Sequence, residues 1–355
     1  MKNIIKNKIL IAIFALIVFI EIGVLFGNQV TFKDDSEFKK FQSKNVPDTL
    51  SGQMIADERI RWSKMMDEVG GVEAYQEFTR QYADKNFGVQ HTMSHVIGEL
   101  IYKKKGLSGL TICDNSFAFG CYHSFYGQAL ADKGLSVIPI ADKFCVDKFG
   151  PLGTGCQHGI GHGLMEYYGP KKLTKALDAC SMTTQLKKLF GCTSGVFMEY
   201  NVPILISATS AETVPRVLDK NRPYDPCPNV KEEYQESCYY EMAQWWDKST
   251  TFNGDYKKIG ELCQALTLPL NRESCFLGVG NVAAPSSNYI VSETIKKCRE
   301  MPTLESKIIC QSGASWSFFS SVTYRSLAGE VCADLDANIK KKCVQQSDLI
   351  GNGLQ

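Results

Sequence analysis

Residues Gly155–Tyr168 read GCQHGIGHGLMEYY and combine a cysteine, two histidines and a glutamate in one short segment. His158, His162 and Glu166 follow one another at intervals of four residues, so on an α-helix their side chains project from the same face. Three glycines interrupt the segment, although glycine in a helix interior costs about 1 kcal/mol relative to alanine. This pattern predicts a helix that another backbone or a ligand approaches closely.

The histidine pattern of this segment recurs upstream. Gly88–Glu99 reads GVQHTMSHVIGE with the same spacing, and Gly120–Gln128 reads GCYHSFYGQ with one histidine. The first histidines of the three copies lie 32 and 35 residues apart, as expected for equivalent positions in a repeat. These copies contain all the histidines of the chain: His91, His95, His123, His158 and His162.

The cysteines show the same period over a longer part of the chain. There are 14, all from Cys113 onwards, and in order they form seven pairs whose two members are separated by seven to eleven residues. First members of successive pairs lie 32 to 47 residues apart, which is the range of helical-hairpin solenoids. The pairs are Cys113/Cys121, Cys145/Cys156, Cys180/Cys192, Cys227/Cys238, Cys263/Cys275, Cys298/Cys310 and Cys332/Cys343.

Each pair sits in a similar local sequence. A helix-like segment such as Lys171–Cys180 leads into the first cysteine, and the second cysteine opens an apolar helix such as Cys192–Tyr200. Two antiparallel helices bring these ends together, so a disulfide within each pair is expected, although spacing alone does not fix the connectivity. Zinc fingers use cysteines two to four residues apart, closer than any pair here. The fold class predicted is therefore an all-α, disulfide-stapled helical-hairpin array, an α-solenoid.

One unit resembles a known family. Ile112–Gly134, ICDNSFAFGCYHSFYGQALADKG, is similar to the hairpin of the helicobacter-type cysteine-rich repeats, which are secreted relatives of tetratricopeptide-like arrays. The other six pairs have wider spacing than this C-x7-C unit. The resemblance implies an α-solenoid whose concave face binds a protein or peptide, and it implies no catalytic residues.

The N-terminal sequence predicts export. Lys2, Lys6 and Lys8 precede the apolar run Ile9–Phe26, a pattern typical of a signal anchor with the remainder of the chain outside the cytoplasm. A cleaved signal peptide is the alternative, in which case the protein is secreted. We expect a membrane anchor at 1–27, a polar tether at 28–50, histidine-bearing repeats at 51–200, a proline-rich insertion at 201–229 and rear repeats at 230–355.

The histidines and their helical neighbours Glu99 and Glu166 are the candidate site. Imidazole with carboxylate suits zinc, iron or copper, so we predict that all seven residues bind transition metal, as one ion or two. Glu99 and Glu166 are also candidate general bases acting on metal-bound water. If the metal site is catalytic, the protein is predicted to be a metal-dependent oxygenase or hydrolase. If it is not catalytic, the predicted function is metal storage or delivery. Structural hydrogen bonding and metal-free acid–base catalysis are the alternatives.

An interaction scaffold is the second class of function. Trp245 and Trp246 are adjacent, and one of their rings could anchor an envelope protein on the concave face. A formal net charge of +1 gives no sign of nucleic-acid binding. The histidine pairs lack the glutamate of HExxH, so a zincin protease is not expected.

Overall fold

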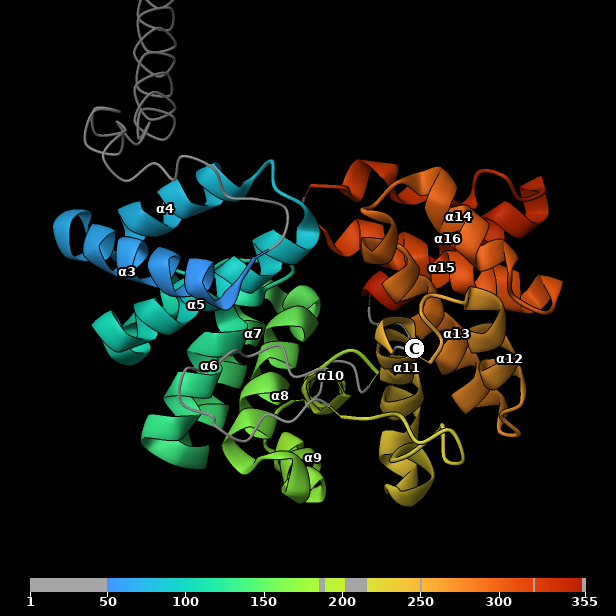
Figure 1. The fold of residues 1–355 in the computed structure, drawn as a ribbon, viewed down its shortest axis with the longest axis horizontal. Coiled ribbons are helices and arrows are strands. Elements are labelled where there is room, and N and C mark those ends of the chain that lie inside the picture. Colours follow the sequence, from blue (N-terminus) through green and yellow to red (C-terminus); the bar gives the residue numbers. More distant parts are fainter. Residues whose placement is uncertain (1–49, 185–188, 202–215, 250, 322, 353–355) are drawn as a thin grey trace, which may run out of the picture. The chain divides into compact units, whose positions relative to one another are not determined.

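The computed structural model describes residues 50–184, 189–201, 216–249, 251–321 and 323–352, and these residues form helices and connections without a strand (Figure 1). The predicted anchor at 1–27 and all but the last residue of the predicted tether lie outside these ranges. Within them, no helix has the length and apolar character needed to cross a bilayer.

The described residues form α-helices of different lengths, joined by short connections. They are α3 (Gly52–Val69), α4 (Gly71–Tyr82), α5 (Phe87–Lys105), α6 (Gly120–Lys133), α7 (Val137–Phe149), α8 (Thr154–Tyr168), α9 (Leu173–Ala179), α10 (Cys192–Asn201), α11 (Glu232–Lys248), α12 (Tyr256–Gln264), α13 (Pro269–Ala283), α14 (Val291–Arg299), α15 (Leu304–Ser320) and α16 (Ala337–Asn352). Short 3₁₀ segments connect several of them, including η3 (Gly150–Gly153) and η8 (Arg325–Cys332).

The disulfide pairing predicted from the repeat is confirmed for every pair. All seven bridges join consecutive cysteines, with Cα atoms 5.5–6.0 Å apart, and no cysteine is free. Each bridge ties the end of a shorter segment to the longer helix that follows, as in Cys145 of α7 and Cys156 of α8. Seven disulfides fit an oxidising, extracytoplasmic or secreted location.

The longer helices α5, α6, α8, α10, α11, α13 and α15 pack in sequence, each against the next (Figure 1). Glycines allow this close approach. A Cβ atom on Gly161 of α8 would lie 2.0 Å from the Cys192 carbonyl oxygen of α10, and one on Gly195 would lie 1.9 Å from the His158 carbonyl oxygen. The prediction that a backbone approaches the glycine-rich segment is therefore confirmed.

The N-terminal end of the row is covered by α3 and α4, which both contact α5. Trp62, Phe78 and Tyr82 are fully buried, with the ring centroids of Phe78 and Tyr82 4.8 Å apart. These aromatic contacts close the face of α5 that has no earlier repeat to pack on.

The predicted insertion at 201–229 is described only from residue 216 onwards, apart from Asn201. The helices on its two sides nevertheless pack together. Thr193 of α10 and Ser237 of α11 share a buried hydrogen bond of 2.9 Å between their hydroxyl oxygens. The front and rear repeats are therefore continuous across this segment.

Contacts also join helices that are distant in the row. The ring of Phe87, at the start of α5, lies 5.5 Å from the ring of Tyr289, which follows α13. The α16 helix likewise contacts η3. Because of these contacts, the face shared by the longer helices is partly enclosed rather than open along its length.

Candidate metal centre

The five histidines converge from three neighbouring helices. His91 and His95 lie on α5, His123 on α6, and His158 and His162 on α8. Neighbouring imidazole ring centroids are only 4.3–5.6 Å apart. The repeat therefore brings together side chains up to 71 residues apart in the sequence.

The first group contains His91, His95 and His123. The Nε2 atom of His95 lies 3.2 Å from Nε2 of His91 and 3.1 Å from Nδ1 of His123. Nitrogens that share a tetrahedral zinc ion at about 2.0–2.1 Å are about 3.3–3.4 Å from one another. The three imidazoles are thus spaced as ligands of one ion are spaced, and their rings are inclined by 63–75° to each other.

The second group contains His123, His158 and His162. The Nε2 atoms of His158 and His162 face each other at 3.0 Å. The ring of His123 is nearly parallel to that of His162, with 15° between the planes and 4.3 Å between centroids. In this arrangement an ion in the plane of one of these rings lies outside the plane of the other. The second group is therefore a preformed histidine pair that needs a ring rotation to add His123.

The Phe117 carbonyl fixes the orientation of His91. The carbonyl oxygen lies 2.8 Å from His91 Nδ1 and can only accept, so Nδ1 carries the hydrogen and Nε2 keeps its lone pair for the group. The backbone at this point is strained, because Phe117, Ala118 and Phe119 all have positive φ angles of 52–60°. Left-handed conformations cost non-glycine residues about 1–2 kcal/mol each. A strained turn that aims a carbonyl at a ring nitrogen is typical of a functional site.

The histidines of α8 are oriented by α10 and α11. Nδ1 of His162 lies 2.8 Å from the buried Glu199 carboxylate, to which it donates. Nδ1 of His158 lies 3.1 Å from the Ser194 hydroxyl, and that hydroxyl donates to Glu241. A hydroxyl has one hydrogen, so Ser194 accepts from His158 when Glu241 is ionised. Burial raises the pKa of Glu241 to about 8, so this state needs the carboxylate form that a nearby cation favours. Both Nε2 lone pairs then point at each other, an arrangement that a shared cation stabilises.

Burial keeps these imidazoles neutral at physiological pH. It lowers the pKa of His91 to about 4 and that of His158 to about 3. Burial, with added repulsion from neighbouring imidazoles, also lowers the pKa of His123 and His162 well below the ordinary range. A neutral imidazole is the form that binds metal, so no proton has to be displaced from these rings.

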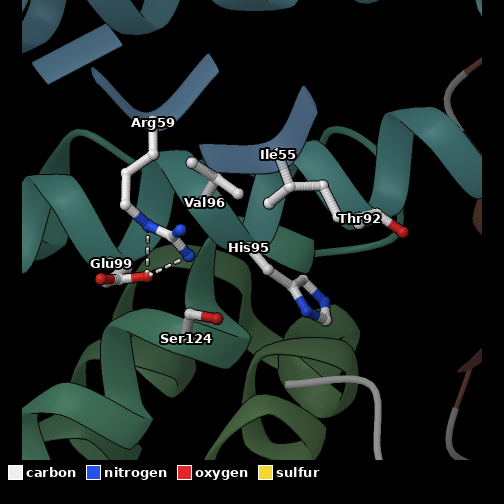
Figure 2. A pocket seen from close by; sticks show the side chains of 7 residues that line it. All are labelled: Ile55, Arg59, Thr92, His95, Val96, Glu99 and Ser124. Atoms are coloured by element: carbon white, nitrogen blue, oxygen red, sulfur yellow. Dashed lines mark hydrogen bonds and ion pairs between the residues drawn. The ribbon is translucent and has the colours of Figure 1, made fainter. Parts of the chain in front are cut away.

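Glu99 and Glu166, the two glutamates predicted to join the histidines, are not part of the two histidine groups. Glu99 pairs with Arg59, at 3.1 Å, and with Lys103, and Figure 2 shows its carboxylate turned towards Arg59 while the His95 ring points away. Burial raises the pKa of Glu166 to about 7, with a further contribution from the negative charge of Glu99. The roles of both glutamates as ligands or general bases stay predictions.

Sequence reasoning missed the acids that do contact the histidines. Glu199 accepts from His162, and Glu241 is linked to His158 through Ser194, and the two acids are only 5% and 2% exposed. Ser194 lies two residues after Cys192, the position that the first histidine occupies in the histidine-bearing units. The available signal was an acidic residue inside an otherwise apolar second helix.

A cavity of about 790 Å³ lies beside the histidines. His91, His123 and His158 contribute to its wall, together with residues of α10, α11, α13 and α15. Its size is within the range of small-molecule sites. An ion bound by the first group would therefore be next to a space that admits a ligand.

Comparison with protein-family models, curated proteins and solved structures finds no match to this chain. The helical hairpins and their disulfides agree with the cysteine-rich repeat class that Ile112–Gly134 resembles, while membership of that family has no support beyond this architecture. The buried histidine groups, which could hold a metal, are thus the feature from which function can be argued.

Proposed function

We propose that this protein is an extracytoplasmic metal-binding protein that holds transition metal ions with its five histidines. The observation that carries the proposal is the convergence of neutral imidazole nitrogens at 3.0–3.2 Å, with ring partners that direct lone pairs inwards. Imidazole donors without thiolate suit zinc, copper or iron. A thiol-free site is also stable in an oxidising compartment.

Two ions of different affinity are proposed. The first group already has ligand spacing and inclined rings, whereas the second needs His123 or His162 to rotate. His123 is common to both groups, and its Nε2 atom is buried without a hydrogen-bond partner among the described residues. Nδ1 faces the first group, so Nε2 is the nitrogen left for the second. The ion in the first group therefore binds more tightly.

A catalytic role is favoured over storage by the neighbouring cavity. Three protein nitrogens leave a further coordination position, which is the arrangement of catalytic rather than structural sites. A metal in such a position supplies Lewis acidity or an activated water, as in a hydrolase or an oxygenase. Glu166 is retained as a candidate for proton transfer because its pKa of about 7 suits that role.

Metal analysis tests the proposal. The exported domain is produced oxidatively with a tag free of histidine, stripped with a chelator, and titrated with Zn²⁺ and Cu²⁺ against a chromophoric competitor. We expect two binding steps. His91→Gln removes the tighter step, His158→Gln removes the weaker one, and His123→Gln weakens both.

The control for these variants is Ser312→Ala, at the equivalent position of α15, which leaves both steps unchanged. Near-ultraviolet circular dichroism confirms that each variant is folded. Absence of stoichiometric metal in the wild-type protein, or binding that survives His123→Gln unchanged, would overturn the proposal.

Attachment to a membrane through 1–27 and recognition of an envelope protein on the concave face remain proposals. Of the two tryptophans considered as a partner anchor, Trp246 has a fully buried ring that donates to the Pro223 carbonyl at 3.0 Å. Trp245 is 4% exposed and donates to the Arg216 carbonyl. Both tryptophans therefore belong to the packing of α11.

A further inference from the structure

Part of the wall of the cavity beside the histidines is aromatic, formed by eight Phe, Tyr and Trp rings. Rings from the first and last parts of the chain face the same space, and they are those of Phe87, Phe119, Phe149, Phe190, Tyr240, Tyr289, Trp316 and Phe319. Aromatic surface of this kind buries an apolar ligand body and disfavours a strongly hydrated one. The wall therefore selects for a molecule with a substantial apolar part.

The charged groups in the same wall are mostly positive. Three cations, Lys148, Lys248 and Arg325, line the cavity, against the single carboxylate of Glu241. Glu241 already accepts a hydrogen bond from Ser194. Among the described residues, no ion pair involves any of the three cations. The cavity thus carries an excess of positive charge that its own wall does not neutralise.

Two of these cations are held by backbone oxygens. Lys148 donates to the Cys113 carbonyl at 2.6 Å and to the Tyr122 hydroxyl at 3.2 Å. Arg325 donates to the Phe319 carbonyl at 2.8 Å. Lys248, at the end of α11, has no such contact among the described residues, and its side chain is exposed to solvent. Lys248 is therefore the cation available to a ligand.

The position of Lys248 relates it to the histidines. Lys248 and His91 line the same cavity. One turn earlier on α11, the buried Oε1 atom of Gln244 has no hydrogen-bond partner among the described residues and also lines the cavity. A free cation and an unsatisfied amide oxygen thus lie along one face of α11, near the histidine groups.

We propose that this cavity binds an organic carboxylate with an aromatic or other apolar body, the carboxylate lying at Lys248 and the body against the aromatic wall. The positive charge supplies selectivity for the anion, and the rings supply most of the buried area. This site goes beyond the metal proposal and does not depend on it, because Lys248 and the rings are present without an ion.

The experiment compares 1-pyrenebutyrate with its methyl ester, which share the apolar body and differ in charge. Binding to chelator-treated, metal-free protein is followed by pyrene fluorescence. We expect the acid to bind at least about tenfold more tightly than the ester, as charge-assisted hydrogen bonds allow. Lys248→Met, which keeps the length of the side chain, removes this preference while the ester binds as before.

Two further variants place the site. Lys257→Met, at an exposed lysine of α12 outside the cavity, leaves the preference unchanged. Asn281→Trp, which adds a large ring to the cavity wall, weakens the acid and the ester together. Failure of both probes to bind, equal affinities for the two, or a preference that survives Lys248→Met would overturn the proposal. Because no metal is present, these outcomes are independent of the metal titration.

Discussion

The front helices α5, α6 and α8 and the rear helices α11, α13 and α15 share one backbone arrangement but differ in what they bury. In both halves a glycine meets the backbone of a neighbouring long helix. An added Cβ would lie 2.0 Å from a carbonyl oxygen at Gly98 in the front and 2.0 Å at Gly278 in the rear. The side chains two residues after the second cysteine of each pair, by contrast, belong to different chemical classes.

In the rear half these positions are Tyr240, Leu277 and Ser312. Tyr240 and Leu277 form a buried apolar cluster with Phe190, and Trp316 packs against it. Ser312 donates to the Ile308 carbonyl of its own helix at 2.9 Å. The repeat therefore packs well without a histidine at this position. Packing alone does not require the imidazoles of the front half, which supports the proposed metal site.

The largest effects on stability are expected from glycine-to-alanine variants. They test whether the front and rear halves have the same helix packing. Gly161→Ala places a Cβ 2.0 Å from the Cys192 oxygen, and Gly280→Ala places one 1.8 Å from the Cys310 oxygen. We expect each to lower the free energy of unfolding by about 1–3 kcal/mol, because the helices must separate. Urea denaturation of the metal-free protein measures this.

The same glycine variants should differ in metal affinity. Only Gly161→Ala moves α8 away from α10, which carries Glu199 and Ser194, so only this variant should weaken the second binding step. Gly52→Ala is the control, because a Cβ there meets nothing within 4 Å. If Gly280→Ala weakened metal binding equally, the separation between a chemical front and a structural rear would be wrong.

The sequence was sufficient for the parts of the structure that depend on local periodicity. Cysteine spacing predicted all seven disulfides, and the four-residue histidine spacing predicted one helix face for each pair. Convergence of the three histidine helices followed because equivalent positions of stacked repeats lie side by side.

Features that depend on how the helices rotate and curve along the row could not be predicted from the repeat period. The carbonyl that holds His91 comes from a strained turn, and the positive φ angle of Phe117 cannot be predicted from its residue type. Glu241 reaches the site across the segment at 202–215, 47 residues from Ser194. The cavity is lined by Phe87 and Tyr289, whose contact joins distant units and is not encoded by the repeat period.

An intermediate effect is expected from the acid that orients His162. Glu199→Gln keeps an oxygen that can accept from Nδ1 but removes the negative charge that makes the imidazole a better ligand. Loss of such a partner typically lowers metal affinity about 10–100-fold. Competition titration measures the change, which should be confined to the second step.

Ser312→Ala and Glu232→Gln are the matched controls for Glu199→Gln. Ser312 is buried at the histidine-equivalent position of the rear half, and Glu232 is an exposed acid of α11. Neither should change either binding step. An equal loss in the Ser312→Ala protein would show that general packing, rather than the carboxylate at His162, sets the affinity.

The smallest effect concerns the pH dependence of stability in the metal-free protein. Burial raises the pKa of Glu241 to about 8, so the folded state retains a proton that the unfolded chain releases near pH 4.5. Stability therefore falls as the pH rises from about 4.5 to about 8. Below about pH 6.5 the histidines act in the opposite direction, because burial lowers the pKa of His91 to about 4 and that of His158 to about 3.

Above pH 6.5 the histidines no longer contribute to the pH dependence of stability, because they are neutral in both the folded and the unfolded state. The contribution of Glu241 can therefore be measured there. Between pH 6.5 and 8 the Glu241 contribution amounts to at most about 2 kcal/mol, since one pKa unit corresponds to about 1.4 kcal/mol. Glu241→Gln should reduce the fall in the free energy of unfolding between pH 6.5 and 8, as measured by urea midpoints. The control is Glu300→Gln, at an exposed acid of the rear half, which should not change this fall. A decline that persists unchanged in Glu241→Gln would mean that this carboxyl is ionised in the folded state. The Ser194 hydroxyl would then donate to the carboxylate throughout this pH window, which leaves the Nε2 lone pair of His158 directed at the metal site.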